Sequence, residues 1–361
     1  MLERRLYFHI DWAMVGALVA LCLIGLAQIY SATGGPTRIY YTQIYGMLLG
    51  TVALVICLAI DYRSLADKSH LIYIGILLLL VYVLFFGAVR GGSRRWIDLH
   101  VFNLQPSEFA KAAVALVLAK FFGESRRGTP TRSDLLIAGA ITAVPLLIIM
   151  RQPDLGTAAT LLPILFAVAY VAGMPMRLFG IIALVGVLLA PVAWKFALKD
   201  YQRERISTFL DPSQDARGAG YQQIQARITT GSGGLWGKGF MKGTQGQLRF
   251  LPVAHNDFVF SVLAEEHGFA GVLVTLGLYL FVILRALEAA RLAKDRLGAY
   301  LVLGVLASFT FQVIYNVTMA AGLAPVKGLT LPLMSYGGSS MIATLAGFGL
   351  ILNVRMRRFT N

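Results

Sequence analysis

Residues 70–89 read HLIYIGILLLLVYVLFFGAV, twenty consecutive positions without Asp, Glu, Lys or Arg. A helix of about 20 apolar residues is long enough to cross the hydrocarbon core of a bilayer. Hydrocarbon offers no partner for unpaired backbone groups, so a stretch of this kind must be helical. The stretch therefore predicts a transmembrane helix.

Similar apolar blocks recur along the whole chain of 361 residues, of which 57% are hydrophobic and only 14% charged. Soluble domains carry about a quarter charged residues. The composition therefore predicts an all-α polytopic integral membrane protein, with residues 1–361 as one membrane domain. We predict ten spans, at residues 12–32, 40–60, 70–89, 105–122, 134–151, 156–173, 177–197, 258–286, 299–323 and 336–355. The first block is too long for the apolar part of a cleaved signal peptide, which is the alternative there.

Lys and Arg in the short loops set the orientation, because they concentrate on the cytoplasmic side. With the N-terminus inside, the inner segments hold sixteen of them, including Arg4, Arg5, Arg126 and Arg127, and the short outer segments hold six. Both termini are therefore predicted to be cytoplasmic. This role also accounts for the net charge of +14, and no basic helix or aromatic platform suggests a nucleic-acid partner.

Residues 198–257 form a long outer loop between the seventh and eighth predicted spans, rich in Gly and in basic residues. Loops of this length are usually functional or disordered. Apolar residues such as Leu235, Trp236 and Phe240 are interspersed along it. They predict short interfacial helices that pack on the bilayer surface or on the bundle.

Several ionisable residues fall at or near membrane depth, where charge is costly. Glu108 and Lys111 share one helical face at i, i+3. They predict either a buried ion pair or a lysine that meets a substrate phosphate. Asp154 precedes Leu155-Gly156-Thr157 in a pattern typical of a helix N-cap. Asp257 is interpreted either as an N-cap of the eighth span or as a functional carboxylate.

The chain has no HExxH, CxxC, Walker or Gly-x-Ser-x-Gly motif. Nucleotide-driven chemistry is therefore excluded as a leading hypothesis. A membrane enzyme with this sequence would use a substrate that carries its own energy.

Long motifs resemble those of the SEDS family (shape, elongation, division and sporulation), in particular its elongation members. They are GTQGQLRFLP at 243–252, VAHNDFVF at 253–260, AEEHG at 264–268, QPSE at 105–108, QPDLGT at 152–157 and SYGGSS at 335–340. Together they extend over nearly the whole chain. The family usually has Thr where this chain has Asn256, and Asn keeps a hydrogen-bonding side chain there.

The resemblance implies a peptidoglycan glycosyltransferase that polymerises lipid II at the outer face of the bacterial cytoplasmic membrane during elongation. It also implies a class B penicillin-binding protein as partner, beside other membrane proteins of the elongation complex. The substrates would be lipid II and a glycan on undecaprenyl pyrophosphate. The partner helix is expected near Leu306, Phe309 and Phe311, on the eighth and ninth spans.

Transfer from an α-linked sugar pyrophosphate to a β-linked polymer requires inversion, hence a base for the incoming hydroxyl and positive charge for the leaving group. We predict Asp257 as the base. Arg205 and Lys111 are predicted at the pyrophosphate, with Arg94 and Arg95 as weaker candidates. The other predicted substrate-binding residues are Gln105, Glu108, His255, Asn256, Glu265, Ser335 and Ser339. No metal cluster is evident, although a divalent cation, Mg²⁺ or Mn²⁺, could assist.

Two alternatives remain open at this point. Ten spans with charges in a cavity also suit a lipid II flippase, and a polymerase of another lipid-linked glycan would share the chemistry. The Gly337-Gly338 pair predicts either a substrate-lined cavity or close helix packing through small residues.

Overall fold

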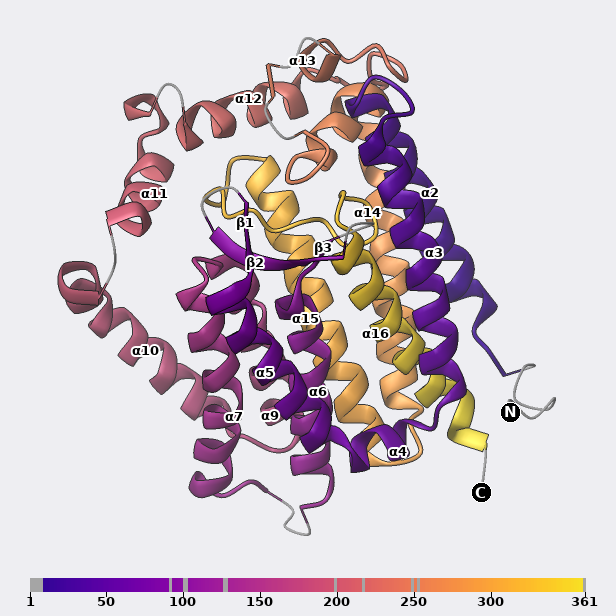
Figure 1. The fold of residues 1–361 in the computed structure, drawn as a ribbon, viewed down its shortest axis with the longest axis vertical. Coiled ribbons are helices and arrows are strands. Elements are labelled where there is room, and N and C mark those ends of the chain that lie inside the picture. Colours follow the sequence, from indigo (N-terminus) through magenta and orange to yellow (C-terminus); the bar gives the residue numbers. More distant parts are fainter. Residues whose placement is uncertain are drawn as a thin grey trace.

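The computed structural model describes residues 9–90, 93–99, 103–125, 129–197, 200–215, 218–247, 250–251 and 254–359. Arg4, Arg5, Arg126 and Arg127, counted above for the topology, lie outside these ranges. The long helices form a bundle, except that one of them, residues 176–192, slants away from the others and has no buried residue (Figure 1). They are α2 (Trp12–Ala32), α3 (Arg38–Ala59), α5 (Ser69–Phe86), α6 (Pro106–Gly123), α7 (Arg132–Arg151), α8 (Leu155–Ala159) with α9 (Leu161–Val171), α10 (Met176–Val192), α14 (Val259–Arg291), α15 (Arg296–Ala320) and α16 (Gly338–Met356).

These helices coincide with the ten predicted spans. Within the described residues, seven of them are long and apolar enough to cross a membrane, and α8–α9 and α10 are shorter apolar segments. The tenth, α6, has the necessary 18 residues but also carries Glu108, Lys111 and Lys120. The predicted all-α polytopic membrane fold is confirmed.

Two spans differ from the prediction. The seventh ends as an α-helix at Val192, soon after Pro191, and residues Ala193–Ala197 form a π-helical turn. The eighth, α14, has 33 residues, about 50 Å of helix, which exceeds the ~30 Å of the hydrocarbon core. It is broken at Gly268, where φ is 63° and ψ is −164°.

The start of α2 and the end of α16 lie at the same end of the bundle. The carboxylate of Asp11 caps α2 by accepting a hydrogen bond from Met14 N. The same carboxylate forms ion pairs of 2.8 Å with Arg285, near the end of α14, and with Arg355, near the end of α16. This cluster ties three helix ends together.

Helices α3 and α16 pack closely because small residues lie between them. A Cβ atom on Gly46 would lie 2.9 Å from Cα of Gly338, and one on Gly349 would lie 2.6 Å from the carbonyl oxygen of Leu54. The predicted packing role of Gly338 is therefore confirmed. At the other end of this pair, Asn353 Nδ2 donates to the carbonyl oxygens of Leu58 and Ile60, both at 2.7 Å.

A small antiparallel sheet between α5 and α6 was not predicted. Its strands are β1 (Ala88–Arg90), β2 (Ser93–Asp98) and β3 (Asn103–Leu104), in the order β1-β2-β3. The predicted third span ran to residue 89, but α5 ends at Phe86, and Gly87 starts the turn into β1. The sheet crosses one end of the bundle (Figure 1).

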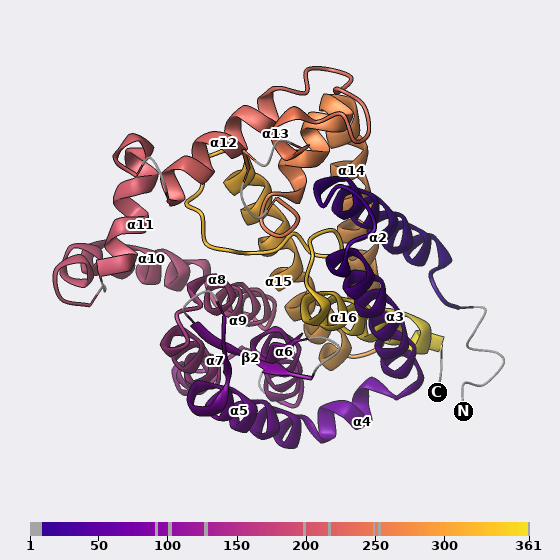
Figure 2. The same cartoon turned by 45° about the horizontal axis from the view of Figure 1, so that its top comes forward.

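The long loop contains the short helices that its apolar residues predicted. They are α11 (Asp200–Leu210), α12 (Ala219–Gly231) and α13 (Thr244–Gln247). Figures 1 and 2 show α11 and α12 extending from α10 over the end of the bundle. Ala226 of α12 is buried with Leu251, Phe258, Val262 and Met319 in a second apolar core. This core fixes the loop to the start of α14.

The predicted partner surface near Leu306 and Phe309 is wrong, because both side chains are 4% exposed, whereas the third predicted residue, Phe311, is half-buried against Tyr315. The ring of Phe309 packs edge-on against Phe348 at 4.9 Å and lies 5.9 Å from Tyr279. These residues belong to the main core, so they are not available to a partner helix.

Candidate active site

A cavity of about 650 Å³ lies where the sheet, the starts of α6 and α8, the loop helices and the segment before α16 meet. Polar and charged residues make up much of its wall. They include Thr42, Arg95, Asn103, Gln105, Glu108, Asp154, Thr157, Arg205, Gln222, Asn256, Asp257, Lys327, Thr330, Tyr336, Ser339 and Ser340. Six of the ten predicted site residues therefore line a single cavity, although they come from distant parts of the chain.

Asp257 lies on this wall just before α14, and its main chain is firmly held. Asn316, a fully buried residue of α15, donates from Nδ2 to the carbonyl oxygens of Asp257 at 2.9 Å and Leu329 at 2.7 Å. The N-cap of α14 is Phe258, without a side-chain cap, so the N-cap interpretation of Asp257 is wrong. Among the described residues, none forms a hydrogen bond or ion pair with the carboxylate of Asp257.

The electrostatic surroundings of Asp257 suit a base. Burial raises the pKa of Asp257 to about 6, although the nearby Arg95 and Arg205 oppose this and Asp154 adds to it. Desolvation disfavours the charged form of a carboxyl group, which accounts for the direction. A carboxyl group with this pKa is ionised at neutral pH and is more basic than an ordinary Asp.

Three cations share the cavity wall with Asp257. Arg205 comes from α11, Arg95 from β2, and Lys327 from the segment between α15 and α16. Burial lowers the pKa of Lys327, and Arg205 lowers it further. Two cations near enough to influence each other form a site where an anion would relieve their repulsion.

Asp154 has both a structural and a cavity position. Its side chain accepts a hydrogen bond from Thr157 N at 3.1 Å, so the predicted N-cap of α8 is confirmed. Its other oxygen accepts from Gln105 Nε2 at 3.0 Å and lies 3.4 Å from a guanidinium nitrogen of Arg95. Asp154 therefore orients Arg95 and Gln105 at the cavity.

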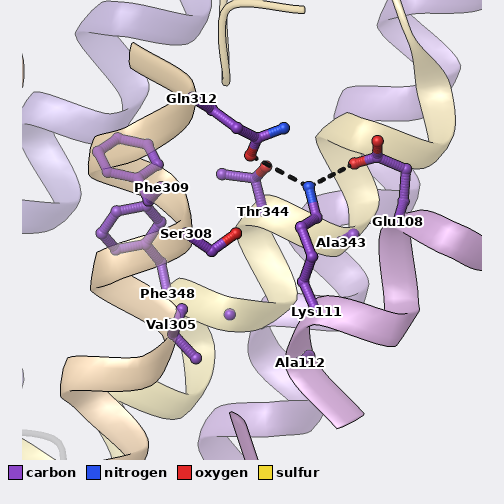
Figure 3. Close-up of a pocket in the computed structure, with 11 residues that line it drawn as sticks. Glu108, Lys111, Ala112, Val305, Ser308, Phe309, Gln312, Ala343, Thr344 and Phe348 are labelled. Atoms are coloured by element: carbon purple, nitrogen blue, oxygen red, sulfur yellow. Dashed lines mark hydrogen bonds and ion pairs between the residues drawn. The ribbon is translucent and has the colours of Figure 1, made fainter. Parts of the chain in front are cut away.

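Lys111 forms the predicted buried ion pair but does not line this cavity. Its Nζ donates to Glu108 at 2.8 Å and to Gln312 Oε1 at 3.1 Å, as Figure 3 shows. The three residues line a separate cavity of about 30 Å³, which has room for one or two water molecules. A lipid phosphate does not fit there, so the structure favours the ion-pair interpretation. Glu108 borders both cavities.

Gln105, Ser335 and Ser339 form hydrogen bonds around the start of α16. Gln105 N donates to Ser339 Oγ at 2.9 Å, and this hydroxyl donates to Asn103 O at 2.7 Å. Ser335 Oγ accepts from Leu331 N at 2.8 Å and is not on the cavity wall. Gly337 and Gly338 do line the cavity, so both interpretations of this pair hold together.

His255, Asn256 and Glu265 have different positions. Asn256 lines the cavity. The side chain of His255 does not line the cavity. Its backbone carbonyl accepts a hydrogen bond from Tyr336 N at 2.9 Å. Burial lowers the pKa of the His255 ring, because it disfavours the charged form. Glu265 is fully buried beneath the loop and is not part of the wall. Its predicted contact with substrate is therefore not supported by its position.

Sequence reasoning missed Lys327, which it counted only as a loop charge. Lys327 is the single charged residue of residues 321–337, and it precedes Gly328, whose φ is 69°. A lone cation in a segment of small and apolar residues is the signal that could have found it. Trp96 and Gln222, also on the wall, had no comparable signal.

No group of three or more His, Cys, Asp or Glu side chains in the described ranges could hold a metal ion by itself. Asp154 is already occupied by its hydrogen bonds and Glu108 by its ion pair with Lys111, which leaves Asp257 as the available carboxylate of the cavity among the described residues.

Comparison with known proteins identifies relatives of this chain. The profile of the family described as "Cell cycle protein", which is named for FtsW, RodA and SpoVE, matches residues 4–359. The peptidoglycan glycosyltransferase MrdB of Escherichia coli K12 is 39% identical over 97% of this chain and 94% of its own. The peptidoglycan glycosyltransferase RodA of Treponema pallidum is 32% identical over 96% of this chain and 98% of its own.

Solved structures agree. A chain of a peptidoglycan synthase complex, solved to explain how polymerization and crosslinking are coordinated, matches with a TM-score of 0.87 and 35% identity. It aligns over 98% of this chain and 99% of that one. The rod shape determining protein RodA of Thermus thermophilus matches with a TM-score of 0.74 and 31% identity, over 98% of both chains. This chain belongs to the FtsW, RodA and SpoVE family of cell cycle proteins.

Proposed function

We propose that this protein is a peptidoglycan glycosyltransferase that polymerises lipid II into glycan strands during cell elongation. The observation that carries the proposal is the carboxylate of Asp257, which pairs with none of the described residues and shares its cavity with three cations and the paired carboxylates of Glu108 and Asp154. The relatives MrdB and RodA are named peptidoglycan glycosyltransferases, which supports the proposal.

The proposed reaction is a single displacement. The hydroxyl oxygen of the acceptor sugar attacks the anomeric carbon of the donor, and its proton passes to the carboxylate of Asp257. The bond between that carbon and the pyrophosphate oxygen breaks, and undecaprenyl pyrophosphate leaves with the electron pair. General-base assistance of this kind contributes about 10² to 10⁴ in rate.

The leaving pyrophosphate gains negative charge, which Arg205 and Lys327 are suited to stabilise. Arg binds phosphate oxygens in a bidentate manner and stays charged. A bound phosphate beside Lys327 would raise its lowered pKa again, because an anion favours the charged form of the amine. Arg95, held by Asp154, is the third cation of the wall.

A divalent cation, Mg²⁺ or Mn²⁺, fits the site only together with substrate. Mg²⁺ is commonly held by one or two carboxylates and substrate phosphates. Asp257 and the pyrophosphate would supply such ligands, and the ion would neutralise charge on the leaving group.

The partner that we propose is a class B penicillin-binding protein, with other membrane proteins of the elongation complex. A chain of a peptidoglycan synthase complex is among the structural relatives. Leu273, Gly277, Leu280, Leu284 and Leu287 follow a heptad spacing along α14, and the four leucines are 42 to 55% exposed. A Cβ on Gly277 would meet nothing within 4 Å. Small residues let membrane helices approach closely, so this stripe suits a single partner helix.

The protein is an integral membrane protein, and we propose that it resides in the bacterial cytoplasmic membrane with the cavity on the outer side. The Lys and Arg bias of the loops supports cytoplasmic termini. The ion pairs of Asp11 support a common side for the two ends.

The decisive experiment is polymerisation of purified lipid II by the protein with its penicillin-binding partner. Asp257→Ala should abolish glycan strands while leaving folding and partner binding intact. The matched control is Asp200→Ala on α11, whose carboxylate is exposed and, among the described residues, pairs with Arg203 at 3.5 Å. Wild-type rates in Asp257→Ala would refute the base assignment. Transfer of lipid II across vesicles without polymer by the wild type would favour a flippase.

A further inference from the structure

The mechanism above does not use two adjacent buried carboxylates that contact the loop segment, Glu265 and Glu266. Glu265, seven residues into α14, has no exposed surface. A buried carboxylate is tolerated only where its charge is compensated by hydrogen bonds and a counter-charge. The groups that compensate the charge of Glu265 must therefore lie next to it.

The 232–246 segment supplies that compensation. The carboxylate of Glu265 accepts from Lys238 Nζ at 2.7 Å and from the backbone nitrogens of Gln245 at 3.1 Å and Gly246 at 3.4 Å. Hydroxyl groups of Thr244 at 3.2 Å and Ser232 at 3.4 Å complete the set. One carboxylate thus gathers both ends of a segment of fifteen residues.

Backbone contacts add to this anchor. Lys238 N donates to the carbonyl of Glu265 at 3.0 Å, and Phe269 N donates to that of Gly234 at 2.9 Å. Gly237 needs its missing side chain here, because a Cβ would lie 2.1 Å from the carbonyl oxygen of Glu266. The segment therefore lies directly on the backbone of α14, across the break at Gly268.

The anchor is mechanically connected to Asp257. Residues 259–265 of α14 join the two positions, and Phe258 and Val262 between them are buried in the second apolar core. A displacement of the first two turns of α14 would be passed to Asp257, whose main chain precedes them directly.

We propose that Glu265 is a positioning residue: by binding the 232–246 segment it fixes the first turns of α14 and thereby the carboxylate of Asp257. The proposal rests on the proposed role of Asp257 as the base. Glu265 does not touch the cavity, so its effect is on the geometry of the base and not on substrate binding. Misplacement by about 1 Å through a remote change can lower a rate about 10²-fold.

The test uses Glu265→Gln in the full-length protein with its partner. The amide keeps the shape but loses the charge that pairs with Lys238, and its NH2 group replaces one of the two acceptor oxygens, so that a donor faces either Gln245 N or Gly246 N. The expected result is a kcat for lipid II polymerisation about 10²-fold lower, with KM unchanged. The midpoint of the acid limb of the kcat profile should also move. Lys238→Met should act alike, Lys238→Arg should retain activity, and the double variant should lose no more than either single variant.

The matched control is Glu288→Gln on the same helix, which changes a partly exposed carboxylate at its far end and should polymerise at the wild-type rate. Hydrogen exchange gives a readout independent of activity. The amides of residues 238–246 should exchange about tenfold faster in Glu265→Gln and unchanged in Asp257→Ala. If Asp257→Ala polymerised normally while this exchange still increased, the base assignment would fail and the anchor would stand. Wild-type kcat in Glu265→Gln, or a loss confined to KM, would overturn the positioning role.

Discussion

At the scale of single residues, the site depends on a carboxylate that the fold does not neutralise. Two cations of the wall, Arg95 and Arg205, are close enough to oppose the rise in the pKa of Asp257, but burial dominates and brings it to about 6. An ionised group without a partner in a poorly hydrated place costs free energy. The ionised carboxylate of Asp257, which the proposed reaction needs, therefore lowers the stability of the fold.

The first prediction concerns that cost. A carboxyl group with a raised native pKa stabilises the fold fully below its unfolded value, and this contribution is lost as the pH rises through about 6. Asp257→Asn should therefore raise the unfolding free energy at pH 7 by about 1 to 3 kcal/mol, since one pKa unit corresponds to about 1.4 kcal/mol. Thermal unfolding in detergent measures it. A lower melting temperature in Asp257→Asn than in the wild type would contradict the burial argument.

The second prediction is the pH dependence of the reaction. A base must be deprotonated, so kcat/KM for lipid II should fall about tenfold per pH unit below a midpoint near 6. Rates measured from pH 5 to 8 provide the check. A rate that stayed constant down to pH 5 would mean that another group accepts the proton.

At the scale of elements, helix ends and helix breaks build the cavity. The starts of α6 and α8 meet there through Gln105 and Asp154, linked at 3.0 Å. The break in α14 at Gly268 allows the 232–246 segment to lie on the helix backbone. Irregular backbone near membrane depth is tolerated because it faces protein or a cavity and not lipid.

The third prediction tests the ion pair of α6. Lys111→Met would leave Glu108 buried without its counter-charge, which should destabilise the protein by about 3 to 5 kcal/mol. Adding Glu108→Gln should recover much of this loss, because no buried charge then remains. Melting temperatures of the single and double variants distinguish the cases. Equal destabilisation in both would show that the pair is not the source of the effect.

The fourth prediction concerns the stripe on α14. Gly277→Phe should block close approach of a partner helix and reduce copurification with the penicillin-binding protein. Gly75→Phe on α5 is the control, since a Cβ on Gly75 would likewise meet nothing within 4 Å. Undiminished copurification of Gly277→Phe would place the partner on another face of the bundle.

At the scale of the whole molecule, the helix bundle has a cavity near one end, and ion pairs join α2, α14 and α16 at the other. The pairs of Asp11 with Arg285 and Arg355 bring the starts and ends of three helices together. The cavity and the ion pairs of Asp11 therefore lie at opposite ends of the helix bundle.

The fifth prediction is the orientation of this arrangement. Cysteines introduced as Leu235→Cys, in the long loop, and Arg296→Cys, at the start of α15, occupy exposed positions. In intact cells, a membrane-impermeant thiol reagent should label the first and not the second. Native Cys22 is buried and Cys57 half-buried, and a protein without the added cysteines measures their background. The reverse labelling would place the termini outside.

The sequence by itself determined the spans, because about 20 apolar residues in hydrocarbon have only one way to satisfy their backbone. It also indicated Asp257, Gln105 and Ser339 through motifs, and Arg205 through the chemistry of its side chain. Only the tertiary structure decided which of these residues share a cavity. Lys111 was predicted at the substrate, and Glu265 has a motif position as specific as that of Asp257, yet their charges are compensated in the interior by Glu108 and by Lys238. Whether a buried charge is paired or left free depends on neighbours far away in the chain, and local sequence does not contain that information.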